Sequence, residues 1–130
     1  MKIIETLDFK IGGFADQTDR IILRDSKVYH ELYENNFILK STEPSREDWE
    51  QFWHTIDLLK VWNWKKSYDN EDILDGTQWE LIIKIKGQKE IKIFGSNAYP
   101  APKGTFKSLI QSLNKLSKSE IEFEEEEFFC

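Results

Sequence analysis

The feature that most limits the fold of this chain is an alternation of apolar and polar residues over positions 79–93. The apolar positions of this pattern are Trp79, Leu81, Ile83, Ile85, Ile91 and Ile93. Glu or Lys fills most positions between them, apart from Ile82. A period of two is typical of strands that bury one face. Gly87-Gln88 lies between the two runs and predicts a two-residue turn, because glycine supplies the positive φ of primed turns. The segment therefore predicts an antiparallel hairpin.

The first third of the chain also has the pattern of strands. Four stretches are rich in alternating or β-branched residues: 2–11, 20–24, 28–33 and 37–39. Turn-forming pairs separate them, namely Gly12-Gly13, Asp25-Ser26 and Asn35-Asn36. Short strand-like runs bounded by such pairs are typical of an antiparallel meander. We therefore expect three or four antiparallel strands before residue 43.

Two segments have the three–four spacing of amphipathic helices. Ser45 is a good N-cap and Asp48 stands at the capping-box position, so we expect a first helix from about 46 to 60. Its apolar face carries Trp49, Phe52, Trp53, Ile56 and Leu59. Thr105 is the expected cap of a second helix, whose apolar face carries Phe106, Leu109, Ile110, Leu113 and Leu116. Between the helices, the alternation of Val61 to Trp64 predicts a short strand or an extended exit, and residues 65–77 predict a polar loop.

This order of elements predicts an α+β fold, in which an antiparallel sheet carries two helices on one face. The sheet would combine the N-terminal meander with the C-terminal hairpin. A length of 130 residues fits one domain. Five Trp, four Tyr and nine Phe residues supply enough apolar area for its core.

The net charge of −6 comes from the end of the chain. Residues 120–127 contain six Glu, and no Lys or Arg follows Lys118. The other 18 acidic residues match the 18 Lys and Arg residues, so residues 1–119 carry no net charge. We expect a single domain over 1–119 and an acidic tail over 120–130. A neutral domain lacks the basic surface typical of nucleic-acid binding, so we expect no nucleic-acid partner.

Cysteine content and hydropathy indicate the compartment. Cys130 is the only cysteine, which excludes an internal disulfide and a cysteine-rich metal site. No apolar run approaches the length of a membrane span. Glu5 and Asp8 stand where a signal peptide needs apolar residues. We therefore expect a cytoplasmic protein that does not bind membranes.

No catalytic or cofactor motif is apparent. His30 and His54 have no nucleophile at a spacing that suggests a catalytic pair. The stretch from Asp69 to Gly76 fails the EF-hand pattern, and no glycine-rich phosphate loop is present. We therefore expect no enzyme activity, no cofactor and no metal. A hydrolase with a carboxylate pair stays as an alternative, and its candidates are Asp69, Asp72, Asp75 and Glu80.

Binding of another protein is the leading functional interpretation. The candidate contact residues are Trp62, Trp64, Asn97, Tyr99, Glu124, Glu125, Glu126 and Phe128. Trp and Tyr are common at interface hot spots, and an acidic protein is steered toward a basic partner surface. The tail also carries Ile121 and Phe123, so either solubilisation or docking fits it. A small-molecule site among the aromatic residues around 64–75 is the second alternative.

Two resemblances accompany these patterns. Leu74-Asp75-Gly76-Thr77-Gln78-Trp79-Glu80-Leu81 and Gly95-Ser96-Asn97-Ala98-Tyr99-Pro100, with Trp62, Trp64, Tyr68 and Phe106, resemble a small bacterial domain family of uncharacterised function. This resemblance covers about residues 60–116 and implies no activity. Gly12-Gly13-Phe14-Ala15 is similar to the opening of emfourin-type inhibitors of thermolysin-like metalloproteases. The second resemblance implies a small inhibitor or antagonist. The leading interpretation therefore covers an inhibitor, antagonist or accessory subunit of a bacterial system.

Overall fold

The computed structural model describes residues 2–13, 17–70 and 76–124. Its strands are β1 (Ile4–Gly13), β2 (Asp19–Arg24), β3 (Lys27–Leu32), β4 (Phe37–Thr42), β5 (Ser67–Asp69), β6 (Thr77–Ile85) and β7 (Ile91–Ser96). Its helices are α1 (Arg46–Leu58), the 3₁₀ helix η1 (Val61–Asn63) and α2 (Thr105–Ser117). The expected α+β class is confirmed.

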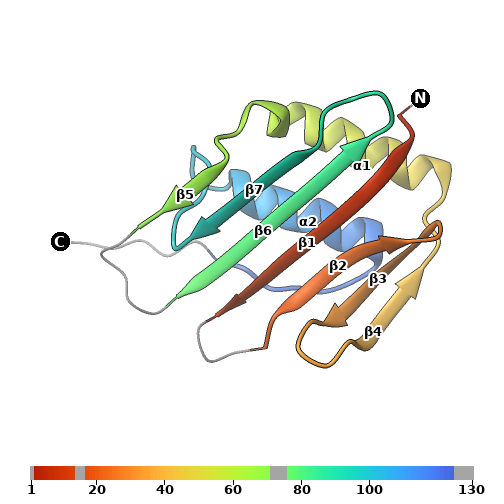
Figure 1. The fold of residues 1–130 in the computed structure, drawn as a ribbon, viewed down its shortest axis with the longest axis horizontal. Coiled ribbons are helices and arrows are strands. Elements are labelled where there is room, and N and C mark those ends of the chain that lie inside the picture. Colours follow the sequence, from red (N-terminus) through yellow and green to blue (C-terminus); the bar gives the residue numbers. More distant parts are fainter. Residues whose placement is uncertain (1, 14–16, 71–75, 125–130) are drawn as a thin grey trace.

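All the strands join one sheet in the order β4-β3-β2-β1-β6-β7-β5 (Figure 1). Neighbouring strands are antiparallel except β5, which pairs parallel with β7. The predicted N-terminal meander is confirmed, and β1 connects it to the C-terminal hairpin through a long pairing with β6. Strand β5 was expected to be polar loop. Its three residues have no periodic pattern, and only the edge of β7 makes them a strand.

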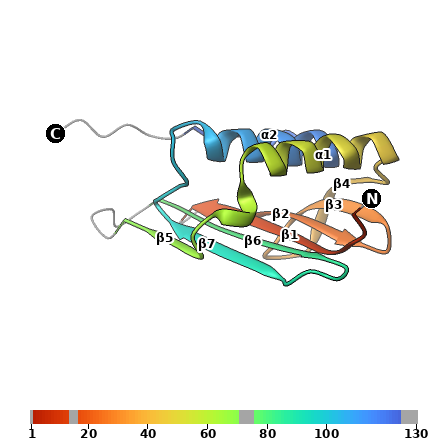
Figure 2. The ribbon, with the colours of Figure 1, turned by 90° about the horizontal axis from the view of Figure 1, so that it is seen from above.

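The two helices cover one face of the sheet, as predicted (Figure 2). The core lies between these layers. It contains the alternating residues of β1 and β6, among them Leu7, Phe9, Leu81 and Ile83, which are fully buried. The other face of the sheet has no covering element among the described residues.

Helix α1 begins as expected. The Ser45 hydroxyl accepts a hydrogen bond from the Asp48 amide at 3.1 Å, and the Asp48 carboxylate accepts one from the Ser45 amide at 2.9 Å. The helix ends at Leu58 because Lys60 adopts a left-handed conformation, with φ of 55°. Residues 61–64 were expected to form a short strand or an extended exit, but Val61–Asn63 forms a 3₁₀ turn and only Trp64 is extended, with φ of −66° and ψ of 152°. No described helix is long and apolar enough to cross a membrane.

Two further details differ from the sequence expectations. Five residues, 86–90, connect β6 to β7, so the turn is longer than two residues, although Gly87 has the expected positive φ of 81°. Helix α2 has Gly104 at its N-cap, with φ of 96° and no capping side chain. Thr105 is therefore the first helical residue and not the cap. In both cases the sequence pattern predicted the element correctly, but the backbone conformation of the neighbouring residues determined where it begins or ends.

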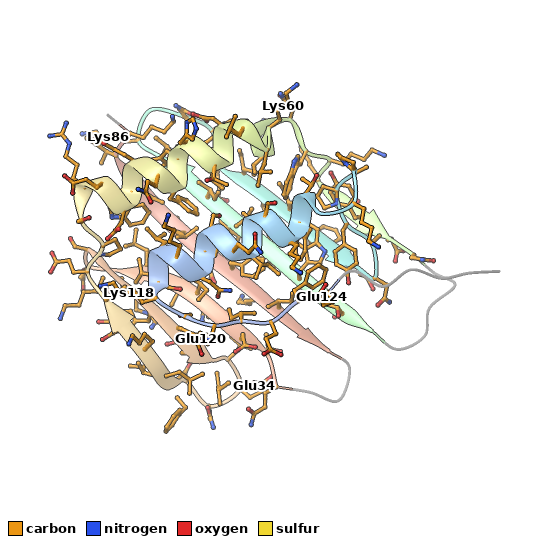
Figure 3. The ribbon with its side chains drawn as sticks, turned by 180° about the vertical axis from the view of Figure 1, so that it is seen from behind. Glu34, Lys60, Lys86, Lys118, Glu120 and Glu124 are labelled. Carbon is orange, nitrogen blue, oxygen red and sulfur yellow. The ribbon has the colours of Figure 1, made fainter. Side chains whose placement is uncertain are left out.

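The chain after α2 packs beside that helix, past Glu120 and Glu124 (Figure 3). Ile121 is only 9% exposed, and its backbone N–H and C=O both bond the Asn114 side chain, at 2.9 and 2.8 Å. The Phe123 ring lies 4.9 Å from the Phe106 ring. Residues up to 124 thus contribute to the helix layer. Residues 125–130 lie outside the described part of the chain.

Trp79 has a contact that depends on the absence of a side chain opposite it. Gly95 is its direct partner on β7, and a Cβ built on Gly95 would lie 2.1 Å from the indole Nε1. The indole therefore passes over Gly95, where its ring lies 5.9 Å from that of Tyr68 on β5. Its Nε1 donates to the Ala98 carbonyl at 3.0 Å. Gly95 thus makes room for the indole between β6 and β5.

We predict that Gly95→Ala lowers the free energy of unfolding by about 1–3 kcal/mol, the usual cost of overpacking a core. Urea unfolding followed by circular dichroism measures this value. Lys92→Ala, at an exposed position of the same strand, is the control and should change stability much less. Equal stability of Gly95→Ala and the parent protein would contradict the proposed packing.

Candidate functional site

A groove runs along the outer side of α1, where the helix lies beside the start of β1. Its volume is about 610 Å³. The lining residues are Lys2, Ile4, Arg46, Trp49, Glu50, Trp53, His54 and Asp57. Six of these come from α1, and the other two come from the start of the chain. The groove combines aromatic surface with charges of both signs.

Helical spacing places these α1 side chains together. Arg46, Glu50, Trp53 and Asp57 follow one another at intervals of three or four residues and so form one stripe of the helix. The core stripe next to it contains Phe52, Trp53 and Ile56. Trp53 belongs to both stripes and is only 7% exposed. It connects the groove to the core, which fixes its ring.

Three tryptophan rings form a row, in which Trp49 and Trp53 line the groove and Trp62 lies beside Trp53. Trp49 and Trp53 stack with their ring centroids 6.0 Å apart and an angle of 22° between ring planes. Trp53 and Trp62 stack at 6.2 Å and 23°. Trp62 lies on η1, which follows α1 after the left-handed Lys60, and its indole bonds Asp57 of that helix. We call Trp49, Trp53 and Trp62, with the groove beside them, the tryptophan groove.

Polar contacts at one end of the groove orient its charges. The Trp62 indole Nε1 donates to Asp57 Oδ1 at 2.7 Å, and the Lys2 ammonium lies 3.3 Å from Asp57 Oδ2. The ammonium also lies 5.9 Å from the centroid of the Trp53 ring, within cation–π range. The Trp62 bond, and then Lys2, hold the pKa of Asp57 below its usual range. Asp57 is therefore a carboxylate at neutral pH.

Two other predicted contact residues, Trp64 and Tyr99, lie in a second aromatic cluster, around Trp79. Trp64 packs edge-on against Trp79, with centroids 6.5 Å apart, and donates to the Leu59 carbonyl at 2.9 Å. Tyr99 lies 5.0 Å from both Phe106 and Phe123. The structure therefore separates Trp62, which is in the tryptophan groove, from Trp64 and Tyr99.

Asn97 belongs to the loop beside this cluster. Its backbone is left-handed, with φ of 57°, and its backbone N–H donates to the Thr77 carbonyl at 2.8 Å. A Cβ on Gly76 would lie within bonding distance of the Asn97 side chain, so the two residues are in close contact. These contacts, with the Trp79–Gly95 packing, bring both halves of the Gly76–Leu81 and Gly95–Pro100 pattern together. The pattern thus has a packing explanation.

The tail residues proposed as contacts have only one described member. The Glu124 carboxylate lies 2.6 Å from the Lys107 ammonium and is 81% exposed. Glu125, Glu126 and Phe128 lie outside the described residues. The carboxylate of Glu124 is exposed to a basic partner, although Lys107 of the same chain already pairs with it.

The uncovered face of the sheet carries a paired charge network. Arg20 binds Asp8 through two bonds of 2.9 and 2.6 Å, and Arg24 binds Glu31 through two of 2.8 and 2.9 Å. Glu31 is only 1% exposed. Its bond to Arg24 holds its pKa below the usual range, with a smaller contribution from Arg20. Because these charges satisfy one another, the network has a structural role and offers few unpaired charges to a ligand.

The candidate carboxylates for hydrolysis lie on different strands or outside the described residues. Glu80 on β6 pairs with Lys10 at 3.5 Å. Asp69 lies on β5, with β7 between the two strands, so two strand spacings of about 4.8 Å separate the backbones that carry Asp69 and Glu80. Asp72 and Asp75 fall in the undescribed stretch 71–75. Within the described ranges, no group of three or more His, Cys, Asp or Glu side chains could hold a metal ion.

Strand β4 carries another exposed apolar surface among the described residues. Phe37, Ile38 and Leu39 are each about half exposed, at 58%, 51% and 48%. The pairing with β3 shifts register between His30 and Glu31, and Lys40 follows the apolar residues. Bulges and edge lysines are features that prevent sheet edges from pairing with other chains. The tryptophan groove is therefore the stronger candidate for specific recognition.

Comparisons with protein-family models, with curated proteins and with solved structures give no match to this chain. The two resemblances noted from the sequence therefore stay predictions. The function must be argued from the geometry of the chain itself.

Most of the groove was not foreseen from the sequence. Trp49 and Trp53 were assigned to the core through their helical spacing, and Trp53 is indeed buried. Lys2, Glu50 and Asp57 were not proposed at all. The spacing of Arg46, Glu50, Trp53 and Asp57 is visible in the sequence, but the approach of Lys2 to Asp57 spans 55 residues and has no local signal.

We predict that the Trp62 indole proton reports the ionisation of Asp57. Its NMR chemical shift should titrate with a midpoint below 3.8, the ordinary value for Asp, because the indole bond and Lys2 stabilise the carboxylate. With a lowered pKa in the folded state, Asp57 stabilises the fold above pH 3.8, and this contribution is lost as the pH falls through the folded-state pKa. Asp57→Asn should remove the titration. A midpoint at or above 3.8 would rule out the described contacts.

Proposed function

We propose that this protein is a non-enzymatic domain that binds another protein, and that the tryptophan groove is its docking site. The partner segment in this proposal carries a basic side chain. The observation that supports it is the row of three stacked tryptophan rings beside the Asp57 carboxylate. An inhibitor, antagonist or accessory subunit would use such a surface.

The aromatic row suits recognition because it is fixed before a partner arrives. Trp53 is held in the core, and Trp62 is held by its bond to Asp57. Stacking between neighbours limits the rotation of Trp49. Tryptophan is enriched among the residues that contribute most to interface affinity, and a rigid surface loses little entropy on binding.

Two exposed carboxylates of the groove support a basic partner, and in the free protein Lys2 and Arg46 pair with them. Asp57 is 50% exposed and Glu50 is 60% exposed, and both lie on the α1 stripe. The six Glu of residues 120–127 make the whole chain acidic, which attracts basic proteins during encounter. Arg46 pairs with Glu50 at the surface, but exposed pairs of this kind are weak and readily exchanged.

A small-molecule site is the second candidate, favoured by the groove's volume of about 610 Å³, which lies in the usual range for ligand pockets. Most of the charged lining side chains are exposed, which suits an extended protein segment better than an enclosed small ligand. The short resemblance of Gly12-Gly13-Phe14-Ala15 to emfourin-type inhibitors supports an inhibitor or antagonist among the protein-binding roles.

A photo-cross-linking experiment can test the docking site. We predict that p-benzoylphenylalanine at His54, inside the groove, cross-links a partner in cells, whereas the same residue at Phe94, exposed on the uncovered face, does not. The captured partner, once purified, should bind the full chain in isothermal titration calorimetry. Glu50→Lys should weaken that binding about tenfold, because it places a repelling charge in the groove.

Glu47→Lys is the matched control for Glu50→Lys. It makes the same charge change on the same helix, but Glu47 does not line the groove, so binding should stay close to that of the parent protein. Equal weakening by both variants would show that only overall charge matters. Cross-linking from position 94 but not 54 would place the binding site elsewhere and overturn the proposal.

A further inference from the structure

The tryptophan groove already contains a cation that comes from the protein itself. The Lys2 ammonium lies over the Trp53 ring, at 5.9 Å from its centroid, and 3.3 Å from Asp57 Oδ2. Asp57 in turn is oriented by the Trp62 indole, which bonds its other oxygen. An aromatic face and an oriented carboxylate can together bind an ammonium or guanidinium group.

We propose that Trp53, Asp57 and Trp62 form a cation subsite, and that an arginine side chain of the partner replaces Lys2 in it. This inference rests on the proposed function and names the group that the groove recognises. Lys2 is then an internal competitor. It occupies the subsite in the free protein and leaves when a partner docks.

The position of Lys2 makes its displacement feasible. Lys2 precedes β1, whose pairing with β6 begins at Ile4. Its side chain is 32% exposed, and the Asp57 side chain that it meets is 50% exposed. Exposed pairs of flexible side chains contribute little net stability. Removal of the Lys2 side chain from the subsite therefore leaves the sheet pairing intact.

Arginine fits the subsite better than lysine does. Its planar guanidinium can contact the Trp53 ring where the Lys2 ammonium now lies and still donate hydrogen bonds at its edge. Asp57 Oδ2 faces Lys2, while Oδ1 accepts from Trp62, so Oδ2 is the acceptor for an incoming donor. A lysine ammonium has no flat surface and would only repeat the contact that Lys2 already makes.

The test uses a defined probe and the full chain. The probe is the peptide acetyl-Gly-Arg-Gly-amide, and its citrulline analogue has nearly the same shape but no charge. Binding is measured by NMR from the indole signals of Trp53 and Trp62, which detects dissociation constants in the millimolar range. Lys2→Met removes the competing ammonium from the subsite. Lys92→Met makes the same charge change on the uncovered face of the sheet and is its matched control.

We expect the arginine peptide to bind Lys2→Met about two- to fivefold more tightly than the parent protein, the range of one exposed cation–π contact. Lys92→Met should match the parent. Asp57→Asn should reduce binding of the arginine peptide to the level of the citrulline peptide. Circular dichroism of each variant confirms that it is folded.

Two results would overturn the cation subsite. One is equal binding of the arginine and citrulline peptides to Lys2→Met, and the other is equal affinity of Lys2→Met and Lys92→Met for arginine. Either could occur while Glu50→Lys still weakens binding of the partner protein, in which case the docking site stands without this subsite. Loss of groove-specific cross-linking, with arginine binding retained, would instead contradict the proposed function alone.

Discussion

The packing of Trp79 over Gly95 is the contact on which most of the structure depends. Trp79 is 3% exposed, and its ring contacts elements that are distant in the sequence. These contacts include Phe106 of α2, whose ring lies 4.6 Å away, and Trp64, which follows η1. Because Trp64 also bonds the Leu59 carbonyl, the same cluster fixes the chain that leaves α1. The position of Trp62 in the tryptophan groove follows from that path.

In the described part of the chain, helices cover only one face of the sheet, so side chains alone shield the backbone on the other face. The outer side chains of β1 to β3 include Asp8, Arg20, Arg24 and Glu31, which bond one another. The Lys10 ammonium and the Arg20 guanidinium carbon lie 4.8 and 5.4 Å from the centroid of the Tyr33 ring. The long stems of Arg and the tyrosine ring shield the backbone of the sheet, so Glu31 becomes buried without a covering helix. Charge pairing thus takes the place of a second layer.

The two aromatic clusters have different consequences, although both contain tryptophan. The rings of the cluster around Trp79 come from β5, β6, the 95–104 loop, α2 and the chain after α2, and they pack against one another. The row of Trp49, Trp53 and Trp62 lies at the border of α1, where one side of the row faces the groove. Both clusters have buried rings at the centre, Trp79 and Phe106 in one and Trp53 in the other, with partly buried rings around them. They differ in their surroundings, because the row containing Trp53 lies beside a groove with charged residues.

The sequence by itself determined the class of fold, the meander, the β6–β7 hairpin and both helices. Each of these elements has a hydrophobic period, of two residues in strands and three to four in helices, that can be read from neighbouring positions. The capping box of α1 was also readable, since Ser45 and Asp48 are three residues apart. Only the tertiary structure decided the rest. Strand β5 exists because β7 offers it an edge, and η1 replaces an expected strand because Lys60 turns the chain. The tryptophan groove joins Lys2 to Asp57 and Trp62 across long stretches of chain, and contacts between distant residues leave no period in a sequence.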